Sequence, residues 1–309
     1  MSRFIRSWEL LKCSVSVVGS NRKLLLFPIV ITILMVVISL FVIAPIALWH
    51  TGHGYTESAH WQTVAHRWVA WDAEGKNVSV NPAGYALLAG IYLVSTFLAT
   101  FFNVAFYSQI LNALRGRPVS VSGGLRVASA RWKAIIAWSL FAGLVGLIIK
   151  GLEERVGFIG RWIIRLIGLA WSVASVFVIP AIVIEEEKAN PVEFLKTSAM
   201  LLKRTWGESL LGYLGIQFGG LLVILGSILI LAISTVLSIV LHNFWFLGIG
   251  SVIWFLGLVF FMYLLNVAGQ VYMGALYLYA AGGEVPAPFN PAQMNMAWKV
   301  KDGSVPAKE

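Results

Sequence analysis

The fold follows first from residues 24–49, which read LLLFPIVITILMVVISLFVIAPIALW. This stretch contains no charged residue, and a membrane span needs only about 20 apolar residues to cross roughly 30 Å of hydrocarbon. It is also longer than the apolar region of a signal peptide, so we interpret it as an uncleaved span. The chain is therefore predicted to be an integral membrane protein.

Composition supports the same class. Of the 309 residues, 59% are hydrophobic and 12% are charged, whereas soluble domains carry about 25% charged residues. The net charge of +9 reflects basic residues that flank apolar runs, which indicates attraction to anionic membrane lipids rather than to nucleic acid. Membrane lipids are thus the expected partners. Cys13 is the single cysteine, so no internal disulfide is expected.

Further apolar runs give the number of spans. Runs at 83–111, 132–149 and 163–184 each have about the length of a span. From 210 to 279 the chain is apolar almost throughout, and its clearest polar break is at 242–243, which is His-Asn. We interpret this region as two long helices that turn at the break, which gives six spans. Three shorter spans also fit its length and would place the C-terminus outside.

The distribution of Lys and Arg predicts the orientation. Most of the 23 basic residues lie before span one, between spans two and three, between spans four and five, and in the tail after span six. The positive-inside rule places these segments in the cytoplasm, so both termini are expected there, as an even number of spans requires. A bacterial inner membrane is the expected location.

One pattern recurs three times along the chain. A basic amphipathic stretch leads straight into an outgoing span at residues 4–23, 125–133 and 191–204. Such stretches are typical of helices that lie in the membrane interface. We therefore predict an all-α fold, a polytopic transmembrane helix bundle of about six spans. It is built as three hairpins, each preceded by a cytoplasmic interfacial helix.

The third of these stretches has the clearest helix start. Asn190 is an N-cap residue, Pro191 suits the first helical position and Glu193 stands at the third, which is a capping-box arrangement. The apolar face predicted for this helix consists of Val192, Leu195, Ala199 and Leu202.

The chain divides into three parts. Residues 1–23 form an N-terminal cytoplasmic amphipathic segment, and 24–281 form the six-span membrane domain. An external loop, 50–82, lies within that domain and is long enough for a small helix around 63–71. Residues 282–309 are rich in Gly, Pro and polar residues, so they are expected to form a flexible cytoplasmic tail.

Four local strings point to a family. They are Leu26-Phe27-Pro28, Phe101-Phe102-Asn103-Val104-Ala105, Trp171-Ser172-Val173 through to Pro180, and Arg204-Thr205-Trp206-Gly207-Glu208. They resemble a family of bacterial six-span inner-membrane proteins whose function is uncharacterised, and the resemblance covers most of the chain. It implies a topology without an activity. The chain is also distantly similar to the membrane domain of some glycerophosphodiester phosphodiesterases, although it contains no phosphodiesterase domain.

The carboxylates argue against an enzyme and against proton-coupled transport. All fourteen Asp and Glu residues lie in loops, tails or span ends, whereas proton pumps keep an acid or a histidine relay inside the bilayer. A hydrolase likewise needs a placed proton carrier. We therefore predict no enzymatic activity and no cofactor. Gly123-Gly124, beside Ser120 and Ser122, lacks the pattern of a phosphate-binding loop and is interpreted as a turn before a helix.

Four amides embedded in the spans are candidate ligand-binding residues. They are Asn103, Gln217, Asn266 and Gln270, and all fall in the cytoplasmic half of their spans. Asn266 and Gln270 are four residues apart and therefore share a helix face. Two interpretations remain open: hydrogen bonds between helices, or a polar vestibule that opens to the cytoplasm.

Two arginines at the outer end of span four are also candidates. Arg161 and Arg165 are four residues apart, and Arg165 lies deeper in the span. Snorkelling of the side chains towards lipid headgroups is the ordinary explanation. An external site for an anion or a lipid headgroup is the alternative, with Arg165 as its best candidate.

The histidines of the external loop are further candidates. His50, His53, His60 and His66 cluster in the loop without a zinc signature, so they are either interfacial imidazoles or a weak metal or pH-sensing site.

The glycines that suit close helix packing form a second group. This packing lies either within one protomer or between copies of the chain. The residues are Gly143 and Gly146 in span three and Gly215 and Gly219 in span five.

Three classes of function are considered, and a membrane enzyme is the least favoured because no acid, base or nucleophile groups converge. The sequence slightly favours a passive channel or transporter for a small solute or lipid, because four amides in one half of the bilayer exceed what packing requires. The alternative is a membrane scaffold or assembly partner that binds anionic lipid and associates with itself or with other membrane proteins.

Overall fold

The computed structural model describes residues 3–71, 78–185, 189–205, 208–286 and 289, with side chains described except at 3–8, 11, 71, 78, 204–205 and 208–223. This part of the chain is helical apart from one two-stranded hairpin and the loops between the elements. The predicted all-α membrane fold is therefore confirmed.

Six helices are long. They are α2 (Leu26–Ala47), α4 (Pro82–Leu114), α6 (Trp132–Arg155), α7 (Phe158–Ala174), α10 (Glu208–Val240) and α11 (Trp245–Gly282). Short elements connect them. These are α1 (Arg3–Ser20), η1 (Arg22–Leu25), α3 (Ser58–His66), β1 (Val69–Trp71), β2 (Val78–Val80), α5 (Val121–Ala130), α8 (Val178–Ile184) and α9 (Pro191–Thr205).

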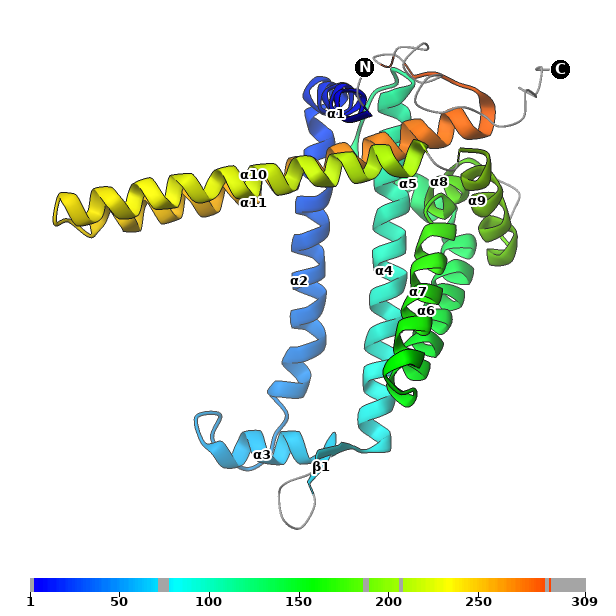
Figure 1. Cartoon of the computed structure of the whole chain (residues 1–309). Helices are drawn as coiled ribbons and strands as arrows, with labels where there is room; N and C mark the ends of the chain where they lie inside the picture. Colours follow the sequence, from blue (N-terminus) through cyan, green and yellow to red (C-terminus); the bar gives the residue numbers. More distant parts are fainter. Residues whose placement is uncertain (1–2, 72–77, 186–188, 206–207, 287–288, 290–309) are drawn as a thin grey trace.

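The short helices gather at one end of the long ones (Figure 1). Helices α2, α4, α6 and α7 run in a common direction, and α6 packs against both α4 and α7. Helices α1, α5, α8 and α9 lie at one end of this group, whereas α3 and β1 lie at the other. The hairpin of α10 and α11 lies across the end with the short helices. We call that end the packed end and the opposite end the loop end.

Helix α2 corresponds to the apolar run at residues 24–49 from which a membrane protein was predicted. It follows the short 3-10 turn η1, and the Tyr263 hydroxyl donates a hydrogen bond to the Leu25 carbonyl at this point. Apart from the buried Phe27, the side chains of α2 are almost all apolar and are half-buried or exposed, with Phe41 81% exposed. A helix that is hydrophobic all round belongs in lipid or in a protein core.

Helices α4 and α6 pack closely where α6 carries glycines. Asn81 caps the start of α4, because its side chain accepts a hydrogen bond from the Gly84 backbone N–H at 2.8 Å. Further along α4, the Tyr92 hydroxyl donates to the Gly143 carbonyl at 3.3 Å. A Cβ at Gly146 would lie 2.9 Å from that hydroxyl oxygen. These two glycines therefore make room for Tyr92 within one chain.

The fourth predicted span, 163–184, is not continuous. Helix α7 ends at Ala174 and α8 starts at Val178. Pro180 has no backbone N–H and would break a continuous helix, but it is tolerated in the first turn of α8. The Phe177 N–H exposed by the break donates to the Ser198 hydroxyl on α9 at 3.0 Å. Residues 158–184 still have the length and composition of one membrane span, so the predicted fourth span is present with a break inside it.

Helix α9 starts as predicted but buries a different face. The Asn190 side chain accepts from the Val192 N–H at 3.0 Å, as an N-cap does. Val192 and Ala199, which were placed on the apolar face, are exposed. The face is rotated because Phe194 is the side chain that packs into the core. The residues that α9 buries are Phe194, Ser198, Leu201 and Leu202.

The small helix of the external loop lies earlier than predicted. It covers Ser58–His66, and the residues after it form β1, which pairs antiparallel with β2. The register places Val69 opposite Val80. The expected helix around 63–71 failed because Val69 and Trp71 favour a strand.

Region 210–279 forms two helices, as predicted, and not three. They turn between Val240 and Trp245, so the turn contains the polar pair at 242–243. Along 224–262 the hairpin exposes apolar side chains outside the contact between its two helices, including Phe244 at 84%, whereas Ser234 is buried against Gly250. Among the described residues, five helical segments have the length and composition of membrane spans, and 224–240 of α10 is a shorter apolar segment. A surface of this kind belongs in hydrocarbon.

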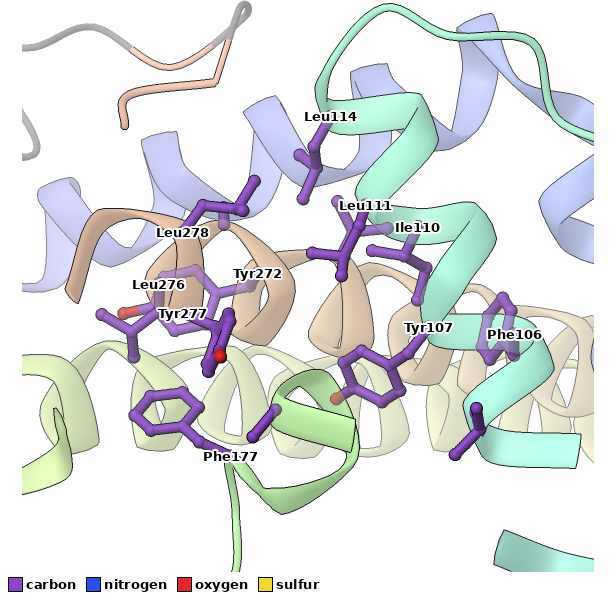
Figure 2. Close-up of a cluster of buried hydrophobic side chains, with 14 of the residues drawn as sticks. Phe106, Tyr107, Ile110, Leu111, Leu114, Phe177, Tyr272, Leu276, Tyr277 and Leu278 are labelled. Carbon is purple, nitrogen blue, oxygen red and sulfur yellow. The ribbon is translucent and has the colours of Figure 1, made fainter. Parts of the chain in front are cut away.

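The hydrophobic core lies at the packed end. Figure 2 shows Tyr107 and Ile110 of α4 on the side of Tyr272 and Tyr277 of α11, with Phe177 approaching from the start of α8. Phe106 lies on the other side of α4, where its ring stacks on that of Phe27. Tyr272, Tyr277 and Phe177 are among the largest fully buried side chains. Aromatic side chains thus fill the region where the three predicted hairpins meet, as close packing requires.

The predicted repeat is also present as similarity between amino-acid sequences. Residues 9–14 of α1 read ELLKCS and 193–198 of α9 read EFLKTS. Helix α1 buries Leu10, Ser14, Val17 and Val18, which is the same spacing of buried residues as in α9. The returning helices share a second string: 103–105 and 266–268 both read NVA. Equivalent residues therefore occupy equivalent environments in the first and third repeats.

Gly124 in α5 gives a test of the packing. A Cβ there would lie 2.7 Å from the Ala105 carbonyl oxygen and 2.9 Å from the Phe27 ring. Gly124→Ala is therefore expected to lower the free energy of unfolding by about 1–3 kcal/mol through overpacking. Thermal unfolding in detergent measures this. Gly90→Ala is the matched control, since nothing lies within 4 Å of its added Cβ, and equal effects of the two changes would contradict the packing.

Candidate anion-binding site

The embedded amides lie in different environments. Asn103 and Asn266 are exposed, Gln270 is half-buried, and the side chain of Gln217 lies outside the described residues. None of the three described amide side chains lines the two pockets considered below. The vestibule therefore stays a prediction.

A fifth amide, Gln109, joins two helices. It is buried in α4, where its Oε1 accepts from the Ser120 backbone N–H at 2.9 Å and its Nε2 donates to the Ser108 hydroxyl at 3.1 Å. Ser120 is the N-cap of α5, with its hydroxyl accepting from the Gly123 N–H at 3.0 Å. Gly123 and Gly124 thus belong to the first turn of α5 and are not a turn before it, so that prediction was wrong.

Arg165 is engaged in an ion pair near the loop end. Its Nε lies 2.7 Å from Glu153 Oε1, which joins α7 to α6 across their turn. Arg161 and Arg165 are both exposed. Since its carboxylate partner lies on the neighbouring helix, Arg165 is more simply a link between α6 and α7.

The loop histidines do not form a metal-binding cluster. His60 is buried, and its Nε2 lies 2.9 Å from the Ala47 carbonyl while its Nδ1 lies 2.7 Å from the Thr51 hydroxyl. His53 Nδ1 lies 3.6 Å from Glu57 Oε2 on the surface. No group of three or more His, Cys, Asp or Glu suited to a metal occurs among the described residues.

A basic pocket lies at the packed end, where α4, α5 and α8 meet. Its volume is about 380 Å³. Three arginines contribute to its wall, together with one amide, one hydroxyl and several apolar side chains. The pocket is lined by Ser108, Leu111, Asn112, Arg115, Arg117, Val127, Ala130, Arg131, Val183 and Ile184. We call it the arginine pocket.

The end of α4 fixes two of these arginines. Gly116 adopts φ 67°, in the left-handed region that favours glycine. The Arg117 N–H donates to the Asn112 carbonyl at 2.8 Å and the Gly116 N–H to the Ala113 carbonyl at 3.1 Å, which is a Schellman motif. The motif turns the chain sharply between Arg115 and Arg117, so both side chains reach the same pocket.

Arg115 also connects the ends of α4 and α11. Its Nε and Nη2 donate to the Glu284 carboxylate at distances of 2.9–3.2 Å. Phe289, five residues after Glu284, is only 5% exposed. This part of the predicted tail is therefore held against the core, and residues 290–309 lie outside the described residues.

The third arginine stands at the junction of α5 and α6. Arg131 Nη2 lies 3.4 Å from the Val183 carbonyl of α8. Glu185 follows directly after α8 and is half-buried. The pocket thus combines three guanidinium groups with two nearby carboxylates, those of Glu284 and Glu185, and keeps a positive balance among the described residues.

This arrangement suits an anion. Guanidinium groups donate paired hydrogen bonds to phosphate and carboxylate oxygens, and Asn112 and Ser108 add neutral polar groups. Sequence reasoning used Arg115, Arg117 and Arg131 only to orient the chain. An Arg-Gly-Arg string directly after a span was the signal that could have identified the site.

His60 allows a test of the loop-end structure. His60→Ala removes both hydrogen bonds of a buried ring, so we expect the free energy of unfolding to fall by about 2 kcal/mol. Thermal unfolding in detergent checks the effect. His53→Ala, at an exposed position of the same loop, serves as the control and is expected to change stability little.

Comparison with known proteins adds one family and no function. The chain matches the model of a family of unknown function, DUF6159, over residues 82–287. The matched region begins at α4 and continues past α11, so it includes the arginine pocket. No curated protein and no solved structure matches the chain.

Proposed function

Since the chain belongs to DUF6159, a family of unknown function, we propose its role from geometry: it is a membrane scaffold that holds an anionic phospholipid headgroup in the arginine pocket. The observation that carries this proposal is the position of Arg115, Arg117 and Arg131 around one opening at the end of the spans. Basic pockets between transmembrane helices on the cytoplasmic side bind the headgroups of anionic lipids.

The walls of the pocket fit both parts of a phospholipid. The guanidinium groups and Asn112 offer donors to the phosphate, whereas Leu111, Val183 and Ile184 offer apolar contacts to the first carbons below it. These features favour a lipid over a free ion.

A scaffold is better supported than a channel or transporter. The packed end is filled by buried aromatic side chains, among them Tyr272, Tyr277 and Phe177. The embedded amides line neither pocket. Helix α2 and the hairpin at 224–262 instead offer large apolar surfaces, which suit lipid and contacts with other copies or other membrane proteins.

Arg117 provides the main test. Arg117→Gln removes one charge-assisted contact to the phosphate, so we expect anionic phospholipid to be retained about tenfold more weakly. Native mass spectrometry of the protein released gently from its membrane measures the retained lipid. Arg126→Gln is the matched control, because Arg126 is exposed on α5 and does not line the pocket. Equal retention by the two variants would sink the proposal.

Glu284 provides a test in which lipid retention is expected to rise and not fall. Its carboxylate competes with a phosphate for Arg115. Glu284→Gln is therefore expected to strengthen retention of anionic phospholipid several-fold, since partly exposed ion pairs contribute up to about 1 kcal/mol. The same mass-spectrometric measurement reports it. A loss of lipid in this variant would mean that the ion pair builds the pocket instead of competing for it.

We also propose that the packed end faces the cytoplasm, as the basic loops suggest. Burial raises the pKa of the Cys13 thiol and the Glu9 carboxylate adds to the shift, so this thiol reacts slowly near neutral pH. In a Cys13→Ser background, Thr56→Cys should react with an impermeant maleimide in intact cells, whereas Ser122→Cys should react only after permeabilisation. The reverse pattern would invert the topology.

A further inference from the structure

The loop end contains a second pocket that the proposed function does not use. It has a volume of about 410 Å³ and lies between the end of α2, the segment after it and α3. Two histidines, one arginine and two tryptophans contribute to its wall. The lining residues are Ile46, Trp49, His50, Thr51, Thr63, Val64, His66, Arg67 and Trp68.

A buried histidine holds this pocket together. The His60 ring contacts both the Ala47 carbonyl and the Thr51 hydroxyl, as described above. Tyr55 and Trp61 pack edge-on against the same ring, with centroid distances of 4.9 and 5.1 Å. The segment from Ala47 to Thr51 is therefore fixed against α3, and it places Trp49 and His50 in the wall.

Arg67 is positioned by its backbone and by an aromatic ring. Its carbonyl accepts a hydrogen bond from Asn81 Nδ2 at 2.6 Å. Its guanidinium carbon lies 4.1 Å from the centre of the Trp49 ring. A guanidinium over an aromatic ring is attracted to the face of that ring and still has N–H groups that can donate to an anion.

The chemistry of the wall selects the ligand. The Arg67 guanidinium and the imidazoles of His50 and His66 supply donors, and no carboxylate of the described residues lines the pocket. The hydroxyls of Thr51 and Thr63 are engaged with His60 Nδ1 and the Ala59 carbonyl and add only polar oxygen atoms to the wall. Asp72 and Glu74 lie outside the described residues. The same arginine disfavours a metal cation, which explains why two imidazoles here do not indicate a metal site.

We propose that this loop-end pocket binds a phosphate group. The phosphate belongs either to a phospholipid of the leaflet at the loop end or to a soluble phosphate compound, because both present the same anion to Arg67. Ile46, the last wall residue inside α2, and the two tryptophans would contact the carbon part of the ligand. Tryptophan is enriched at this depth of a membrane.

The test separates the two sources. Binding of inorganic phosphate is measured by calorimetry with the full chain in dodecyl maltoside, which carries no phosphate, and retention of phosphatidylglycerol is measured by native mass spectrometry from mixed nanodiscs. All measurements use an Arg117→Gln background, which weakens the arginine pocket. Arg67→Gln is expected to reduce binding about tenfold in at least one arm. Loss in the calorimetric arm indicates a soluble phosphate, and loss in the lipid arm indicates a phospholipid.

Two further variants keep the result decisive. Arg155→Gln removes one exposed cation from the loop end of α6, outside the pocket, and is expected to leave both arms unchanged. His50→Gln changes an exposed side chain of the wall and is expected to weaken binding a few-fold, so it tests the proposal if Arg67→Gln does not fold. Binding that is the same in Arg67→Gln and Arg155→Gln, or unaffected by His50→Gln when only that variant folds, overturns the proposal.

Discussion

Gly274 of α11 lies against α4, where a Cβ would approach Ile110 Cγ2 to 2.8 Å and Leu114 Cδ1 to 3.3 Å. Because glycine permits this close approach of two helices, α11 crosses α4 at the packed end and buries Tyr272 and Tyr277 beside it. The short helices then cover the crossing from several sides. The arginine pocket depends on the same contact. Its Arg115 lies just after the end of α4 and forms an ion pair with Glu284, which lies just after the end of α11.

The two ends of the molecule obey different physical constraints. At the packed end, polar groups of short helices need partners, and caps and buried hydroxyls supply them, as Ser120 and Ser198 do. Towards the loop end, α2 and much of α7 expose apolar side chains. Lipid tails are as apolar as these side chains, so no hydrophobic force drives the spans together there. A bundle that is tight at one end and open at the other is therefore stable in a bilayer.

Sequence reasoning predicted the parts of the fold that depend on local pattern. Hydropathy located the long helices, and Asn190 located the start of α9, because apolar runs and caps act within a few residues. It missed the break before Pro180, where the freed N–H needed an acceptor from a distant helix. It also predicted the wrong buried face for α9 and did not identify the arginine pocket. Those features depend on which helices meet, and a hydropathy profile does not contain that information.

The arrangement of charge favours holding a ligand over moving one. Basic pockets lie at opposite ends of the long helices, and the two helices that run between them, α2 and α4, contain no charged residue. An anion that crossed along them would lose its hydration without gaining partners, which is costly inside a bilayer. We propose instead that each pocket meets headgroups or solvent at one membrane surface, and that the spans keep the two pockets there.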